Sequence, residues 1–119
     1  MPPRSPKPGL TATSTSWRAI EGLPRRGEIW IIDAGISVLL ISSTVYNEIP
    51  NEPTVIVVPV FDTEPDTGFG VDLGDGWAAP GLVTSLRKAR LTEFRRLIDV
   101  QALTDVNTML FKILATPDR

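Results

Sequence analysis

The sequence predicts a mainly β fold with one C-terminal α-helix, in which short strands form a β-barrel of SH3-like size. Runs rich in Val, Ile and Leu are separated by Gly, Pro, Asn and Asp, as in short strands joined by turns. Near the C-terminus the apolar residues instead recur at helical spacing. The length of 119 residues suits one domain. Many short strands followed by a helix favour a barrel over a parallel α/β sheet.

Three strands are predicted in the first half of the chain. The first covers 27–33 and ends in a turn at Ala34-Gly35. The second covers 36–43 and is almost continuously apolar, which is typical of a strand covered on both faces. The third covers 54–61 and is dominated by β-branched residues. Because proline cannot donate a ladder hydrogen bond, Pro59 indicates a bulge or an edge strand.

Further short strands are predicted in the second half. A loop over 62–68 is followed by alternating apolar residues over 69–73, which indicate a half-buried strand. Another strand is expected over 77–86, interrupted at Pro80-Gly81, and a short one continues over 88–91. Together these segments give five or six strands.

An amphipathic helix of about 15 residues is predicted at the C-terminus. Asp99 is a suitable N-cap, and Pro117 lies beyond the expected end. The apolar positions at helical spacing are Leu103, Val106, Leu110 and Ile113.

The N-terminal part is divided into a flexible tail, 1–16, and the start of a single barrel domain, 17–119. Trp17, Ile20 and Leu23 have a spacing that suits one helical turn covering a barrel end, and a linker is the alternative. Prolines exclude a helix in the tail, which contains Pro2, Pro3, Pro6 and Pro8.

The composition excludes several kinds of chemistry. The chain has no cysteine, so thiolate catalysis and disulfides are excluded, and no histidine, so histidine-based nucleophiles and zinc sites are disfavoured. The remaining candidates for chemistry are carboxylates, Lys, Arg, Tyr46 and hydroxyls, and any metal site would use oxygen ligands. No apolar run approaches the length of a membrane span, so a soluble cytoplasmic protein is expected.

The net charge is −2, but the charges are segregated along the chain. A local basic patch can bind phosphate whatever the overall charge is. The alternative is a solvated face on which the basic residues pair with the acidic segment. The acidic residues are Asp62, Glu64, Asp66, Asp72 and Asp75, and the basic ones are Arg87, Lys88, Arg90, Arg95 and Arg96.

Four segments carry a resemblance to a known family. They are Arg26-Gly27-Glu28-Ile29-Trp30, then Leu39-Leu40-Ile41-Ser42 with Tyr46-Asn47, then Val55 to Pro59, and Lys88-Ala89-Arg90-Leu91. With the helix after Asp99 they span 25–115. In order and spacing they resemble the MazF/PemK toxins, whose fold is shared with the gyrase poison CcdB.

The chain departs from the family pattern at three places. Near Leu82 to Thr84, where the family often has Asp-Gln-x-Arg, this chain has no such run. The family has a long loop between its first two strands that ends in Arg-Pro, and this arginine acts in phosphoryl transfer. Here a short turn is followed by Ile36-Ser37. The family's catalytic Thr or Ser follows the third strand, where this chain has Phe61-Asp62; the nearest hydroxyl is that of Thr63.

The resemblance implies metal-independent cleavage of RNA, with no cofactor. In that reaction the 2′-hydroxyl attacks the adjacent phosphate and leaves a 2′,3′-cyclic phosphate. Without histidine, a carboxylate would be the base and an arginine the phosphate clamp. The candidate catalytic residues are Thr63, Arg87 and Asp62, and the candidate RNA-binding residues are Arg25, Arg26, Lys88 and Arg90.

Several of these residues also have a purely structural interpretation. The segment from Asp62 to Pro65 is interpreted as a turn in which the aspartate bonds its own backbone. Trp30 is expected to lie in the core, and Trp77 is expected to pack against other side chains rather than stack on a base. Glu28 is expected to face solvent on its strand.

Two functions follow from the resemblance. The first is the toxin of a type II toxin–antitoxin pair that cleaves single-stranded RNA. The second is a non-catalytic protein of the same fold that binds a protein partner of the gyrase or antitoxin type. Both imply a homodimer and a cognate antitoxin, whose acidic segment would suit the basic patch.

Overall fold

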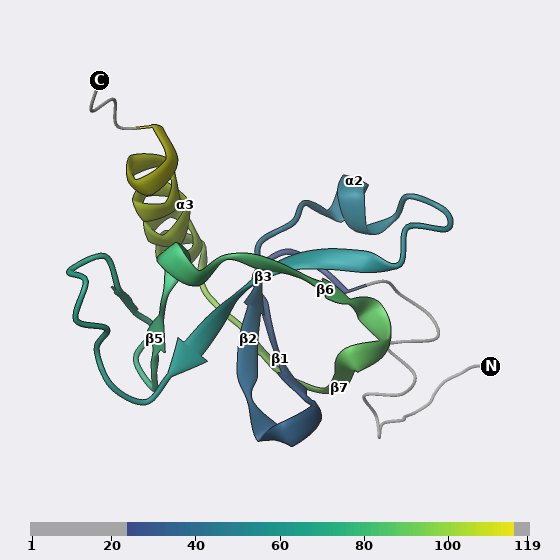
Figure 1. Cartoon of the computed structure of the whole chain (residues 1–119), viewed down its shortest axis with the longest axis horizontal. Helices are drawn as coiled ribbons and strands as arrows, with labels where there is room; N and C mark the ends of the chain where they lie inside the picture. The colour runs from purple at the N-terminus through teal and green to yellow at the C-terminus, as the bar shows by residue number, and fades with distance from the viewer. Residues whose placement is uncertain (1–23, 116–119) are drawn as a thin grey trace.

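The computed structural model describes residues 24–115. Within this range seven strands form one sheet, and a helix follows them (Figure 1). The predicted mainly β fold with a C-terminal helix is confirmed. The expectations for the tail 1–16, for the turn around Trp17 and for Pro117 lie outside the described residues.

The strands are β1 (Glu28–Ile32), β2 (Ser37–Leu40), β3 (Thr54–Phe61), β4 (Val71–Asp72), β5 (Trp77–Ala78), β6 (Thr84–Arg87) and β7 (Leu91–Leu97). The helices are α2 (Thr44–Asn47) and α3 (Val100–Ala115), with 3-10 turns η1 (Asp33–Gly35), η2 (Pro80–Leu82) and η3 (Lys88–Arg90). The antiparallel pairs give the order β4-β5-β3-β2-β1-β7, and β6 also pairs with β3.

Strand β3 lies at the centre of this arrangement and has the predicted bounds. One edge pairs with β2, while the other pairs with β6 over Thr54–Val57 and with β5 at Val60 and Phe61. The expectation of a bulge or an edge strand at Pro59 was wrong, since the β2–β3 register is continuous through this residue. Pro59 falls in the gap between β6 and β5. There its carbonyl accepts from the Ala79 N–H at 3.0 Å, and the donor that proline lacks is not needed.

The sheet buries apolar side chains on both faces, because successive residues of a strand point to opposite sides. One cluster contains Trp30, Val38, Val55 and Leu86. The edge of the Phe94 ring meets Trp30 with 5.9 Å between ring centroids. The opposite cluster is covered by α3, and its buried members are Ile29, Leu39, Ile41, Val58, Val71, Ala78, Ile98 and Val106.

Helix α3 confirms the predicted C-terminal helix and its cap. The Asp99 carboxylate accepts from the Ala102 N–H at 2.7 Å, which satisfies one of the free donors of the first turn. Val106 is fully buried on the face that packs against the sheet. In contrast, Phe111 and Leu114 are about seven-tenths exposed (71% and 70%) on the outer side.

The structure corrects the strand boundaries in the second half. Only Val71 and Asp72 of the run 69–73 are in a strand. The expected strand at 88–91 is instead the 3-10 turn η3, followed by the seven-residue strand β7. Strand β7 shows register shifts against β1, and these disturb the two-residue alternation that would reveal a strand in the sequence.

Glu28 does not face solvent, which corrects the expectation for this residue. It is 1% exposed, because alternation along β1 places it on the same buried face as Trp30. Its Oε1 accepts from Trp30 Nε1 at 3.0 Å and from the Arg25 N–H at 3.0 Å. The carboxylate therefore satisfies an indole that the core would otherwise leave without an acceptor.

A second buried polar group, Asn47 at the end of α2, connects three segments. Its Nδ2 donates to the carbonyl of Pro24 at 2.8 Å and to that of Ser42 at 3.2 Å. The Ser42 hydroxyl in turn accepts from the Ile56 N–H at 3.1 Å. The entry to β1, the helix α2 and the start of β3 are thus held at one place.

Backbone pairing within residues 24–115 leaves β4 and β7 as the ends of the sheet, so these ladders do not close a barrel. In this part of the chain no helix combines the length and the apolar character needed to cross a membrane.

Replacing Glu28 tests the buried acceptor. We expect Glu28→Ala to lower the free energy of unfolding by about 1–3 kcal/mol, because the Trp30 and Arg25 donors lose their partner inside the protein. Glu28→Gln retains an oxygen acceptor and should lose clearly less. Urea titration measures both variants, and equal losses would contradict the role of the acceptor.

Candidate functional site

The predicted site residues fall into separate groups at the two ends of β3. Asp62 and Thr63 follow the C-terminal end of this strand. Arg87 pairs with Thr54 at the N-terminal end. The seven residue steps from Thr54 to Phe61 span roughly 23 Å in an extended strand. The structure therefore does not bring Arg87 into one cleft with Asp62 and Thr63.

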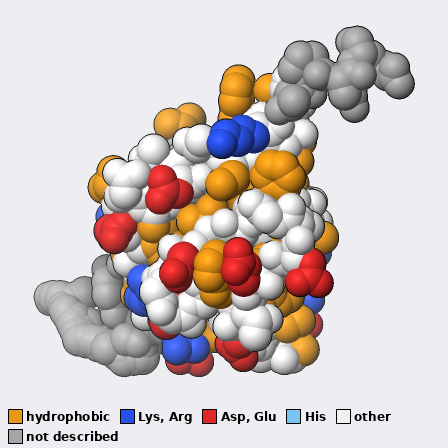
Figure 2. Space-filling model, turned by 90° about the vertical axis from the view of Figure 1, so that its left-hand side faces the viewer, with side chains coloured by type: hydrophobic (Ala, Val, Ile, Leu, Met, Phe, Trp, Pro, Cys, Tyr) orange, Lys and Arg blue, Asp and Glu red, His pale blue; other side chains and the backbone are white. Residues whose placement is uncertain are grey.

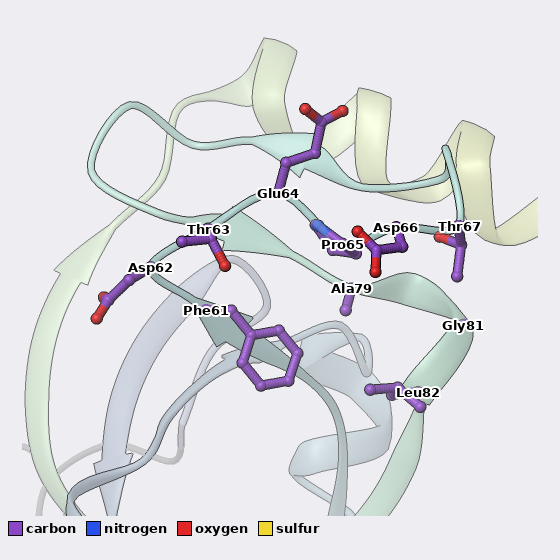
Figure 3. Close-up of a pocket in the computed structure, with 10 residues that line it drawn as sticks. All are labelled: Phe61, Asp62, Thr63, Glu64, Pro65, Asp66, Thr67, Ala79, Gly81 and Leu82. Atoms are coloured by element: carbon purple, nitrogen blue, oxygen red, sulfur yellow. The ribbon is translucent and has the colours of Figure 1, made fainter.

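A large cleft of about 700 Å³ lies beside the loop 62–68. This loop is on the left in Figure 1, the side that faces the viewer in Figure 2. In Figure 3, Phe61 and Leu82 border the space and the Thr63 hydroxyl points toward it, while Asp62 is turned away. The lining residues are Phe61, Asp62, Thr63, Glu64, Pro65, Asp66, Thr67, Ala79, Gly81 and Leu82.

A small cleft of about 190 Å³ lies on the other side of Phe61 and Asp62 and shares both residues with the large cleft. It contains two carboxylates, two guanidinium groups and a hydroxyl. The residues that line it are Ile29, Ser37, Val60, Phe61, Asp62, Asp75, Arg95 and Arg96.

Arg96 connects the two ends of the sheet across the small cleft. It lies on β7, opposite Ile29 of β1, and its guanidinium donates to Asp75 at 2.7 Å and to the carbonyl of Leu73 at 2.9 Å. Asp75 belongs to the turn between β4 and β5. The sheet is therefore curved so far that the Arg96 side chain of β7 reaches the turn after β4, although no backbone ladder joins these two end strands within residues 24–115.

This contact also sets the electrostatics of the small cleft. The hydrogen bond from Arg96 holds the pKa of Asp75 below its ordinary value of 3.8, and the nearby Arg95 charge acts in the same direction. Among residues 24–115, no hydrogen bond or ion pair joins the Arg95 or Asp62 side chain to another residue. A carboxylate and a guanidinium are therefore free to meet a ligand.

Three of the four predicted RNA-binding residues gather with Arg87 at the other end of β3. Lys88 Nζ donates to the Asn47 carbonyl at 2.8 Å, and the Asn47 side chain holds Pro24, directly before Arg25. We call Arg25, Arg26, Arg87 and Lys88 the basic end.

The basic end also contains a carboxylate, that of Glu52. The Thr54 hydroxyl and N–H hold the pKa of Glu52 below its ordinary value, and Lys88 contributes to this shift. The fourth predicted residue, Arg90, lies elsewhere and pairs with Asp33 at 2.9 Å in an exposed contact. The alternative, in which the basic residues pair with the acidic segment, is met for Arg96, which pairs with Asp75. The partner of Arg90, Asp33, lies outside that segment, and Arg87 has no ion pair within the described chain.

Two of the three places at which the chain departs from the family pattern, Ile36-Ser37 and Phe61-Asp62, lie at or next to the small cleft. Ser37 and Phe61 line it, and Ile36 precedes β2. Ile36 and Phe61 expose apolar surface to solvent at 47% and 41%. No group of three or more His, Cys, Asp or Glu that could hold a metal ion occurs among residues 24–115.

The sequence interpretation did not select Arg95 and Arg96 as site residues. Both lie in the basic run, but the register shifts of β7 hide which face each residue takes. The strand order would have identified them. Strand β7 pairs with β1, which pairs with β2 and so lies one strand from β3. The last residues of β7 therefore lie near the end of β3 that carries Asp62.

The sequence matches no family model and no curated protein. The structure, however, is similar to solved structures. An endoribonuclease from Mycobacterial species aligns with a TM-score of 0.72 at 21% identity, over 81% of this chain and 95% of that chain. An endoribonuclease in complex with its cognate antitoxin, also from Mycobacterial species, gives 0.70 at 22%, over 79% and 97%. A MazE–MazF complex from Deinococcus radiodurans gives 0.70 at 20%, over 79% and 98%. The predicted MazF-like fold is thereby confirmed.

The Arg96–Asp75 contact predicts a specific pH dependence. Since the pKa of Asp75 is lowered in the folded state, its stabilisation is complete above pH 3.8 and is lost as the pH falls through the folded pKa. Both side chains are more than a third exposed, so we expect Asp75→Asn to cost less than about 1 kcal/mol.

Urea unfolding of wild type and Asp75→Asn at about pH 6 and about pH 3 checks this contribution. The difference between the two proteins should shrink at the lower pH. A difference that grows on acidification would contradict the assignment.

Proposed function

We propose that this chain is the toxin of a type II toxin–antitoxin pair and cleaves single-stranded RNA without a metal. The observation that carries the proposal is the small cleft, which combines the unpaired Asp62 and Arg95 in a fold shared with endoribonucleases. We assign the chemistry to this cleft, and we assign RNA positioning to the basic end.

Asp62 acts as the general base in this proposal. Its carboxylate takes the proton from the 2′-hydroxyl, whose oxygen then attacks the adjacent phosphorus. The bond from phosphorus to the 5′-oxygen breaks, and that oxygen takes a proton from water. The products are a 2′,3′-cyclic phosphate and a 5′-hydroxyl end.

Arg95 stabilises the charge that develops on the phosphate. A guanidinium offers two parallel N–H donors to phosphate oxygens, and this geometry is not available to lysine. Arg96 holds Asp75 and is therefore a positioning residue. Thr63 lies next to Asp62 with its hydroxyl toward the large cleft, where it could bond the RNA backbone.

The basic end supplies contacts to the RNA backbone. Within residues 24–115 the side chains of Arg25, Arg26 and Arg87 have no ion-pair partner, so their charges are available to phosphates. The same charges suit an acidic antitoxin segment, and structures with an antitoxin occur among those of similar fold.

We propose that the protein forms a homodimer and acts in the cytoplasm, where its RNA substrate is found. The exposed apolar side chains on the outer side of α3 offer area for a subunit contact.

A second candidate function is favoured by Ile36 and Phe61. Both expose apolar side chains at positions where the resemblance places a catalytic arginine and hydroxyl. Apolar residues of this kind suit a contact with a protein partner, of the gyrase or antitoxin type, rather than with phosphate. In this alternative the chain does not cleave RNA.

RNA cleavage can be tested by incubating the purified full chain with a long unstructured RNA in EDTA. We expect sequence-specific fragments with cyclic phosphate ends. Asp62→Asn and Arg95→Ala should each lower kcat by about 100-fold or more, because each removes a group that acts in the transition state. Arg90→Ala is the matched control and should leave kcat unchanged. Intact RNA at excess enzyme would contradict cleavage and favour the protein-binding alternative.

The basic end predicts a different kinetic signature. Arg25→Ala combined with Arg87→Ala should raise KM while kcat changes little, since these residues contact phosphate remote from the reacting bond. Each lost phosphate contact should reduce the dependence of log K on log salt by about 0.7 for single-stranded RNA. RNA-binding titrations across salt concentrations measure this slope. An unchanged slope would contradict the assignment.

A further inference from the structure

We propose that the large cleft binds residues 2–8 of the same chain, Pro-Pro-Arg-Ser-Pro-Lys-Pro, as an extended basic peptide. This inference does not rest on RNA cleavage. It is argued from the chemistry of the cleft, from the spacing of the prolines and cations, and from the reach of the chain.

The large cleft combines an apolar floor with an acidic rim. Phe61 and Leu82 border it with exposed apolar surface, 41% and 57%, and Pro65 adds a further apolar wall. Glu64 and Asp66 both line the cleft; in Figure 3 the Asp66 carboxylate faces the space, and the Glu64 carboxylate lies on the outer side of the loop. Neither carboxylate has an ion-pair partner within residues 24–115, so the cleft presents uncompensated negative charge.

The segment 2–8 has the complementary pattern. A proline-rich peptide favours the polyproline II helix, which has three residues per turn. Pro3 and Pro6 then lie along one edge, and Arg4 and Lys7 along another. The proline edge matches the apolar floor, and the basic edge matches the acidic rim. Because this helix is already extended and stiff, binding it costs little conformational entropy.

The chain is long enough for this contact. Pro24 is held by Asn47, near the start of β3, and the cleft lies at the other end of that strand, roughly 20 Å away. The fifteen residues 9–23 can span up to about 50 Å. Since the segment is tethered, its effective concentration is in the millimolar range, so even a weak contact is populated.

The absence of cysteine allows a direct test on the full chain. Ser5→Cys provides a single attachment point for a nitroxide spin label, and NMR then measures the broadening of backbone amides. We expect broadening at Thr63, Glu64 and Leu82. The amides of Arg87 and Ala89, at the far end of β3, serve as the internal control.

Charge reversal distinguishes docking from chance proximity. Arg4→Glu with Lys7→Glu should reduce the broadening about fivefold, as expected for two exposed ion pairs. Glu64→Lys with Asp66→Lys should do the same, and combining all four substitutions should restore the broadening. Failure of this restoration would overturn the ionic part of the proposal.

A mixed sample identifies which chain supplies the segment. Spin-labelled chain without isotope is combined with isotope-labelled chain that carries no spin label. We expect no broadening in the mixture, because the contact is intramolecular. Broadening in the mixture would show that the segment comes from a second copy and would overturn the intramolecular contact. Broadening absent from both samples would overturn the proposal altogether.

Discussion

The ladder of β3 is the constraint on which the rest of the structure depends. This strand pairs with β2 on one edge and with β6 and β5 on the other, so it fixes four strands relative to one another. The arrangement tolerates Pro59 only because β6 ends and β5 begins on either side of it. The same ladder separates Asp62 from Arg87 by nearly the full length of the strand. The position of each candidate site therefore follows from backbone pairing.

The curl of the sheet produces the small cleft. Arg96 reaches from β7 to Asp75 on the β4–β5 turn, which brings groups from opposite ends of the strand order to the Asp62 side of β3. The contact is exposed and contributes modestly to stability. In the proposed site, Arg96 is engaged by Asp75, whereas Arg95 lines the same cleft as Asp62 and has no side-chain partner among residues 24–115. The unusual Ile36 and Phe61 place apolar surface at the same location, and this is why cleavage and protein binding are both worth testing.

Much of the fold could be predicted because it depends on local pattern. The β-branched run of β3 and the capped periodicity of α3 determine these elements almost without context. Glu28 could not be placed by polarity, because its burial depends on donors around it that include the Trp30 indole and the Arg25 N–H. Only part of the site could be predicted: Asp62 and Thr63 do border clefts, but Arg95 was missed because bulges in β7 disturb the alternation.

The sequence by itself determined that this chain forms short strands followed by one amphipathic helix, with a chemistry limited to carboxylates, hydroxyls and cations. Those features depend on residue type and on spacing over a few positions. The tertiary structure alone decided which charges meet: Arg96 with Asp75, Arg90 with Asp33, and Arg95 in one cleft with Asp62. The physical reason is that strand register and sheet curvature set distances between residues far apart in sequence, and no local pattern encodes them.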